Sequence, residues 1–172
     1  PEEWEKPENK SKLAQKDIDA DWTKKNGERH FGYKDHVKCD ADSKLITNYS
    51  VTSATVHDSQ RCLVFIGQED EVLYADSAYS GKPIALALPE NCKNQICEKG
   101  YRNSPLTSEQ KMNNRRKSRI RCRIEQIFGF MTGAMHGITI RSIGITRAWM
   151  NIGITNLVYN FCRYSYLKRA SA

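Results

Sequence analysis

The order of apolar and polar segments predicts a layered α/β fold with a mixed sheet. Alternating polarity over residues 31–39, an Asp-rich turn at 40–43 and a second β-prone run over 45–51 predict an antiparallel hairpin. A short apolar run then ends at Asp76, and helical patterns dominate the rest of the chain. A hairpin, a helix, a strand and further helices in this order are typical of helices packed on a mixed sheet.

Composition divides the chain into two parts. Residues 1–29 are charged and poor in aliphatic side chains, so we expect a loosely ordered arm. Residues 30–168 carry the periodic patterns and are expected to form one domain, since 172 residues suffice for a single core. The first methionine is Met112, and we therefore expect the natural protein to have further residues before Pro1.

The remaining elements each have a local signal. We expect Asp58 to be the N-cap of a helix and Gly81-Lys82-Pro83 to open a short helix through Leu88. Residues 109–131 predict one long basic helix with an apolar stripe, and residues 147–169 predict the last helix. The stripe consists of Ile120, Ile124, Ile127, Phe128 and Met131.

The charge distribution favours a polyanionic partner. The chain has 27 Lys and Arg residues against 20 acids, a net charge of +7. Residues 111–123 contain many positive charges and no acid, and such a run repels itself unless an anion lies nearby. We therefore expect DNA phosphates there. The expected DNA-binding residues are Arg115, Arg116, Lys117, Arg119, Arg121 and Arg123, with Lys34 and His36 on the outer face of the hairpin.

Cysteine spacing and hydropathy argue against two other classes of protein. The six cysteines form no Cys-x-x-Cys pair, which favours reduced thiols in a cytoplasm over a structural zinc site. The most apolar segment, residues 148–167, is interrupted by Asn151, Asn156, Asn160 and Arg163. This segment predicts a packed helix and not a membrane span.

Two acids are the candidate catalytic residues. Asp76 follows the apolar run at 72–75, and open sheets place their chemistry beyond such strand ends. Glu125 lies in the basic helix, four residues after Arg121 and beside the apolar stripe. Carboxylates of this kind suit a two-metal phosphoryl-transfer site. The alternatives are that Asp76 caps the following turn and that Glu125 is a solvated ion-pair partner.

Four stretches resemble bacterial insertion-sequence transposases of the DDE class, in the order of that family. They are FGYKDH (31–36), VTSATVHDS (51–59), ADSAY (75–79) and RCRIEQIFG (121–129). The resemblance implies an RNase H-like mixed sheet flanked by helices. It also implies DNA transposition by an Asp, Asp, Glu triad that holds two Mg²⁺ (or Mn²⁺) ions, with Asp76 as the second Asp and Glu125 as the Glu.

The resemblance also indicates what this chain lacks. The first Asp of the family lies on a strand upstream of the hairpin, so we expect the domain to be truncated before Pro1. Asp19 and Asp21 are the possible substitutes within the chain. A Tyr and a Lys that flank the Glu in related transposases are Ser118 and Thr132 here. We therefore expect this chain to bind DNA but to be inactive alone.

The intact enzyme is expected to act on transposon ends and target DNA as a homodimer in the bacterial cytoplasm, associated with the nucleoid. Two other functions remain open on the sequence. A related RNase H-like nuclease would hydrolyse strands without joining them, and an inactive remnant of a decayed element would only bind DNA.

Overall fold

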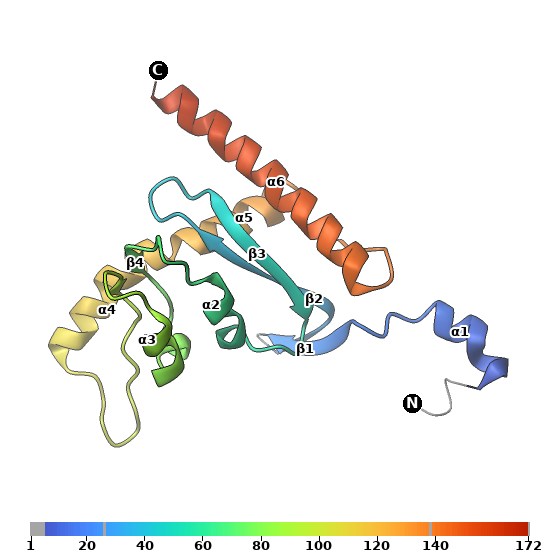
Figure 1. Ribbon diagram of the computed structural model, residues 1–172, viewed down its shortest axis with the longest axis horizontal. Coiled ribbons are helices and arrows are strands. Elements are labelled where there is room, and N and C mark those ends of the chain that lie inside the picture. The colour runs from blue at the N-terminus through green and yellow to red at the C-terminus, as the bar shows by residue number, and fades with distance from the viewer. Residues whose placement is uncertain (1–5, 26, 138, 172) are drawn as a thin grey trace.

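The structure of the protein is a computed structural model that describes residues 6–25, 27–137 and 139–171 (Figure 1). The first elements are η1 (Pro7–Asn9), α1 (Lys10–Ala14) and β1 (Asp21–Lys25). In Figure 1, α1 lies at the edge of the molecule, apart from the sheet. Residues 1–5 of the predicted arm lie outside the described residues.

Three antiparallel strands form the larger sheet. β2 (Glu28–Cys39) lies between β1 and β3 (Ile46–Ser53). Trp22 is paired with Phe31 in the β1–β2 register, and Val37 is paired with Tyr49 in the β2–β3 register. The predicted hairpin is confirmed. The arm predicted over residues 1–29 contributes β1 to this sheet, because its last residues pair with the first half of β2.

A second group of short elements surrounds Asp76. It consists of α2 (Ser59–Phe65), β4 (Val72–Leu73), η2 (Ser77–Tyr79), α3 (Lys82–Ala87) and β5 (Lys93–Asn94). β4 and β5 are parallel, and their ladder continues until the N–H of Cys97 donates to the carbonyl of Ala75 at 3.0 Å. Asp76 therefore follows the last hydrogen-bonded residue of this strand, as the sequence predicts.

Three helices complete the chain: α4 (Ser108–Arg121), α5 (Arg123–Gly133) and α6 (Ile145–Ala170). The prediction of one helix over residues 109–131 is wrong, because the chain tightens at Cys122. There the Cys122 N–H bonds the Ser118 and Ile120 carbonyls and its Sγ contacts the Arg119 carbonyl at 3.2 Å. No helix in the described ranges is both long and apolar enough to span a membrane.

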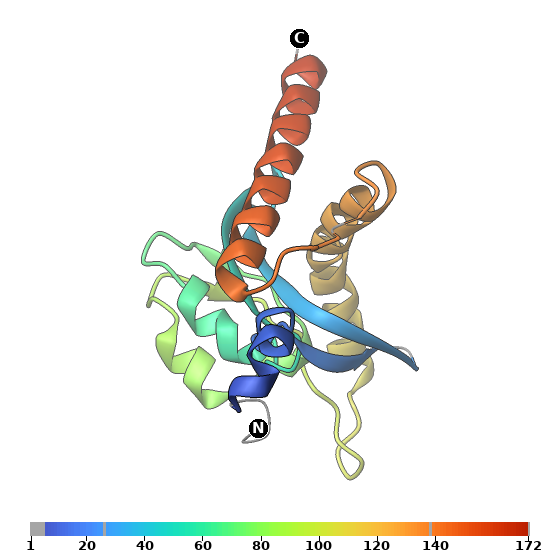
Figure 2. The same cartoon turned by 90° about the vertical axis from the view of Figure 1, so that its right-hand side faces the viewer.

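Two apolar clusters hold these parts together. Ile46 of β3, Ile127 and Met131 of α5, and Tyr159 of α6 form the first cluster. The second lies beneath β4, around Cys62, Ile84 and Ile96. In Figures 1 and 2, α6 crosses the three-stranded sheet and its C-terminal half extends beyond it.

The predicted mixed α/β class is confirmed, and the arrangement is consistent with an RNase H-like domain. The antiparallel and parallel strands form two separate sheets among the described residues, where the sequence predicts one mixed sheet.

Candidate active site and basic helix

Asp76 lies at the N-terminus of η2, in an exposed position. Its Oδ1 accepts a hydrogen bond from the Ser77 N–H at 2.6 Å. Asp76 therefore caps the turn, as the first alternative from the sequence states. A carboxylate has further lone pairs on both oxygens, so a cap can also serve as a ligand.

Glu125 lies in the first turn of α5, where the positive end of the helix favours a carboxylate. Its Oε1 is 2.9 Å from Nη2 of Arg121, and its side chain is 60% exposed. This geometry is that of the solvated ion pair, the second alternative from the sequence.

Tyr79 lies three residues after Asp76 and is half-buried. Burial, together with the charges of Asp58, Cys62 and Asp76, raises the pKa of Tyr79 to about 12, whereas Arg121 lowers it. The hydroxyl of Tyr79 therefore lies within electrostatic range of both Asp76 and Arg121. Arg121 in turn pairs with Glu125.

Asp58 belongs to a polar cluster that the sequence reasoning missed. It precedes α2 but makes no capping hydrogen bond. Its Oδ1 lies 3.5 Å from Lys34 Nζ and 3.5 Å from His36 Nδ1. In the sequence, only the motif VTSATVHDS, which contains Asp58, pointed to this residue. Asp58 was expected to cap α2, and its contacts with Lys34 and His36 were not predicted.

His36 does not lie on an outer face, and that expectation is wrong. The residue is 7% exposed, and its Nε2 is 2.8 Å from Thr52 Oγ1. The Thr52 hydroxyl donates its proton to the Ser53 carbonyl. The Thr52 Oγ1 atom is therefore the acceptor in its contact with His36, and Nε2–H of His36 is the donor. Burial lowers the pKa of His36, and the nearby carboxylate of Asp58 partly offsets this effect.

Lys34 is also engaged within the protein. Its Nζ donates to the carbonyl of Val56 at 2.8 Å, in addition to the contact with Asp58. The segment before α2 thus covers the face of β2 that was expected to be outermost. The predicted DNA contacts of Lys34 and His36 stay predictions.

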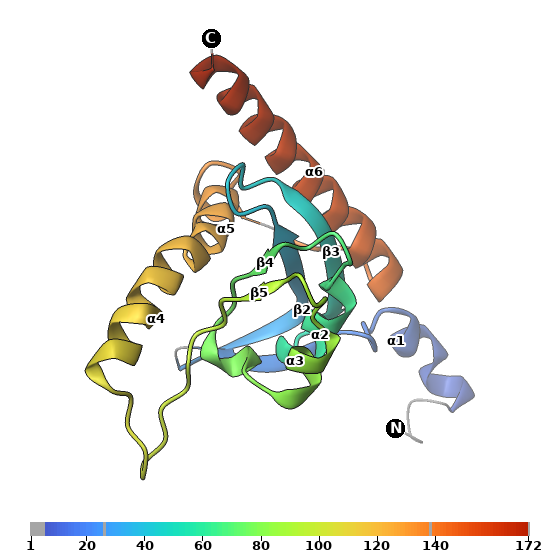
Figure 3. The same cartoon turned by 60° about the vertical axis from the view of Figure 1, so that its left-hand side comes forward.

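The basic helix separates into residues with and without protein partners. Lys117 Nζ donates to the Ile96 carbonyl at 2.9 Å and lies 3.7 Å from Glu98 Oε1. Arg115, Arg116 and Arg119 are exposed and have no such partner among the described residues. Lys117 therefore attaches α4 to the segment after β5, next to which α4 lies in Figure 3.

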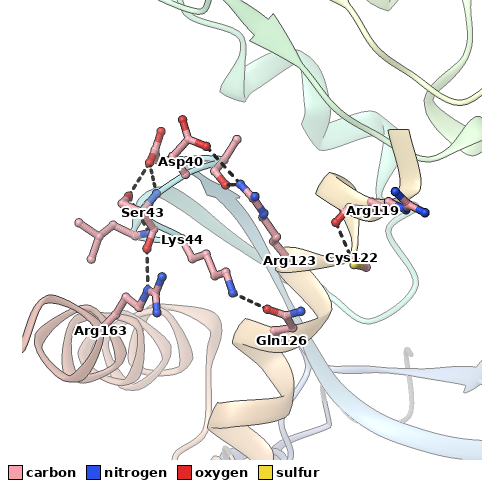
Figure 4. A network of polar contacts seen from close by, with 11 residues as sticks. Asp40, Ser43, Lys44, Arg119, Cys122, Arg123, Gln126 and Arg163 are labelled. Carbon is pink, nitrogen blue, oxygen red and sulfur yellow. Dashed lines mark hydrogen bonds and ion pairs between the residues drawn. The ribbon is translucent and has the colours of Figure 1, made fainter. Parts of the chain in front are cut away.

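Arg123 fixes the turn between β2 and β3. Its Nη1 donates to the carbonyl of Ala41 and lies 3.3 Å from Asp42 Oδ1. Lys44 of the same turn donates to Gln126 Oε1 at 2.5 Å. Figure 4 shows the guanidinium of Arg123 directed at the turn, whereas that of Arg119 points away. Arg123 is thus a structural residue of the turn.

A cationic stripe follows one face of α4. Lys111, Arg115 and Arg119 are four residues apart and line a shallow open groove with Leu106 and Cys122. Residues at this spacing are about 6 Å apart along the helix axis. Three cations in a row, without a salt-bridge partner in the described ranges, can contact successive phosphates of a nucleic acid.

Asp19 and Asp21, the possible substitutes for the first catalytic Asp, both accept hydrogen bonds from backbone N–H groups. Asp19 Oδ2 accepts from the N–H of Ile145 at 2.9 Å, at the start of α6. Asp21 Oδ1 accepts from the Trp22 N–H at 2.7 Å, in exposed β1. Both carboxylates therefore bind nearby backbone.

Asp76 and Glu125 have the right chemistry for a divalent metal ion, because both are exposed oxygen donors. They are only two ligands. Within the described residues, no group of three or more His, Cys, Asp or Glu side chains could hold a metal ion. The described part of the chain thus contains no complete metal site.

Comparison with known proteins shows the family of the chain. Residues 3–161 match the family described as "Transposase DDE domain". The chain is 34% identical over 117 residues to the "Transposase for insertion sequence element IS1106" of Neisseria meningitidis serogroup B, which covers 66% of this chain and 40% of that protein. No solved structure matches. Because the family match covers most of the chain, the protein belongs to the DDE-domain family of insertion-sequence transposases.

Proposed function

We propose that this chain supplies the second and third catalytic acids, Asp76 and Glu125, of a transposase that cuts and joins DNA at the ends of an insertion sequence. The observation that supports this most is the pair of element ends that carry the acids: Asp76 follows the β4 strand, and Glu125 lies in the first turn of α5, directly after the basic helix α4. A strand end thus carries one carboxylate and a helix N-terminus the other.

The DNA backbone would lie along α4. The stripe of Lys111, Arg115 and Arg119, with exposed Arg116 beside it, has the charge and spacing for phosphate contacts. Such contacts position the duplex without reading its sequence. Lys117 and Arg123 would keep α4 and α5 in place rather than touch DNA, because both already have protein partners.

Mg²⁺ or Mn²⁺, held by Asp76, Glu125 and one further acid, would neutralise charge on the reacting phosphate. The residues of this chain prepare that site. The N–H of Ser77 orients Asp76, and Arg121 compensates the charge of Glu125 while no metal ion is bound.

The remaining acid is proposed to come from an upstream strand. The Gly32 carbonyl accepts from Ala54 beyond the end of β3, so the backbone groups of Tyr33, Asp35 and Val37 face the other edge of β2. β1 pairs with residues up to Gly32 only, which leaves that edge without a strand in the described part of the chain. An added strand there would pair with β2 and extend the three-stranded sheet, which packs on α5, the helix that carries Glu125.

We further propose that the intact protein acts as a homodimer on paired element ends in the bacterial cytoplasm, at the nucleoid. Two copies would bring both ends together, and each end would use one set of acids.

The test is DNA cleavage by a protein extended upstream to include that strand. With Mg²⁺ or Mn²⁺ it should cut and join element-end DNA, and Asp76→Ala or Glu125→Ala should abolish both reactions while DNA binding changes less than about twofold. Glu109→Ala, at an exposed acid in the first turn of α4, is the matched control and should stay active. Undiminished cleavage by either catalytic variant would refute the assignment.

A further inference from the structure

A buried side-chain pair joins β2 to α6, away from the proposed DNA site. Asn156 Nδ2 donates to Asp35 Oδ1 at 3.3 Å, and Asn156 is 3% exposed. The other two oxygens of this pair, Asp35 Oδ2 and Asn156 Oδ1, are buried and have no hydrogen-bond partner. Two buried acceptors without a donor are strongly unfavourable.

Among the described residues, no cation and no hydrogen-bond donor contacts these two oxygens, although the hydroxyls of Tyr33 and Ser142 line the same cavity as Asp35. Asp17 and Tyr33 are the titratable groups that line the same cavity in the described part of the chain, and the Tyr33 hydroxyl donates to Asp17 at 2.7 Å. Val51, opposite Asp35 on β3, is apolar and buried. Asn156 is the only polar partner of Asp35 among the described residues, and it presents an oxygen that itself needs a donor.

We propose that, at mildly acidic pH, Asp35 carries a proton on Oδ2 in the folded protein and donates it to Asn156 Oδ1. The carboxylic acid and the carboxamide then form two hydrogen bonds, one in each direction, between β2 and α6. A single proton satisfies both unpartnered oxygens. It also removes the buried negative charge, for which the surroundings hold no counter-ion.

The pair makes the attachment of α6 to the sheet sensitive to pH. Burial raises the pKa of Asp35 to about 6 from the ordinary value of 3.8, although the hydrogen bond from Asn156 acts in the opposite direction. The folded state therefore binds this proton more tightly than the unfolded state. Stability falls as the pH rises from about 4 through about 6, and the loss persists at higher pH.

Asp35→Asn tests the proposal, because an amide can donate an N–H to Asn156 Oδ1 without ionising. We expect its melting temperature to match that of the unchanged 172-residue chain within about 2 °C at pH 4 and to exceed it by roughly 6–12 °C at pH 8. Asp40→Asn is the matched control, since hydrogen bonds from Ser43 lower the pKa of Asp40. It should show no gain at pH 8.

A direct measurement is the ¹³C NMR titration of the Asp35 side-chain carboxyl. A midpoint near pH 6 supports the shared proton, and a midpoint at or below 3.8 overturns it. A loss of stability in Asp35→Asn at pH 8 would also overturn it, since that result requires an ionised Asp35 paired with a cation.

Discussion

The guanidinium of Arg121 lies 2.9 Å from the carboxylate of Glu125, although the helix is interrupted between them at Cys122. The two residues are four apart and face each other across the break. An exposed pair of this kind contributes about 0.3–0.5 kcal/mol. Such a weak pair leaves Glu125 able to exchange Arg121 for another cation.

Two arginines of the basic run should differ in their effect on stability. Arg121→Ala should lower the free energy of unfolding by no more than about 0.5 kcal/mol, because the ion pair is solvated. Arg123→Ala should lower it by about 1–2 kcal/mol, because the carbonyl of Ala41 loses its donor and the turn loses its attachment to α5. Urea denaturation measures both. Equal losses would contradict the assignment of Arg123 as the structural residue.

The salt dependence of DNA binding should report on the cations of α4 that lack protein partners. Replacing Arg115, Arg116 and Arg119 together with alanine should flatten the log–log salt slope by up to about 2.7, at about 0.9 per phosphate contact. Fluorescence anisotropy with duplex DNA at several salt concentrations measures this slope.

The control for that measurement is the simultaneous replacement of Lys6, Lys10 and Lys12, which removes the same charge from the exposed N-terminal segment. Its slope should stay close to that of the unchanged chain. If the two triple variants had equal slopes, net charge and not the face of α4 would determine DNA binding.

The cluster around Asp58 should be visible in the titration of His36. Because burial dominates, the NMR midpoint of the His36 ring should lie below the ordinary value of 6.5. Asp58→Asn should lower it further, since the carboxylate stabilises the protonated ring. An unchanged midpoint in Asp58→Asn would show that the contact has no electrostatic effect on His36, and a raised one would contradict the predicted direction.

Short-range sequence patterns predicted the strand before Asp76 and the β2–β3 hairpin correctly. The apolar run before Asp76 places this acid at the end of a strand, and the alternation over 31–39 gives the hairpin. The break at Cys122 was not predictable, because the flanking residues are all compatible with a continuous helix.

Roles set by distant partners were also outside the reach of sequence patterns. Lys117 and Arg123 look like their basic neighbours, yet they bind carbonyls of Ile96 and Ala41, which are 21 and 82 residues away. Alternation suggested that His36 faces outward, but the segment before α2 covers that side of β2 as well. A sheet covered on both faces does not follow the one-sided pattern of polarity.

In the proposed function, Asp76 and Glu125 hold the same metal ions. The most direct measurement is a crystal structure, with Mn²⁺, of the protein extended to include the upstream strand. Anomalous scattering should place Mn²⁺ at about 2.0–2.5 Å from carboxylate oxygens of both residues, with Arg121 released from Glu125. Mn²⁺ bound to only one of the two acids, or carboxylates too far apart to bind a common pair of ions, would contradict the account.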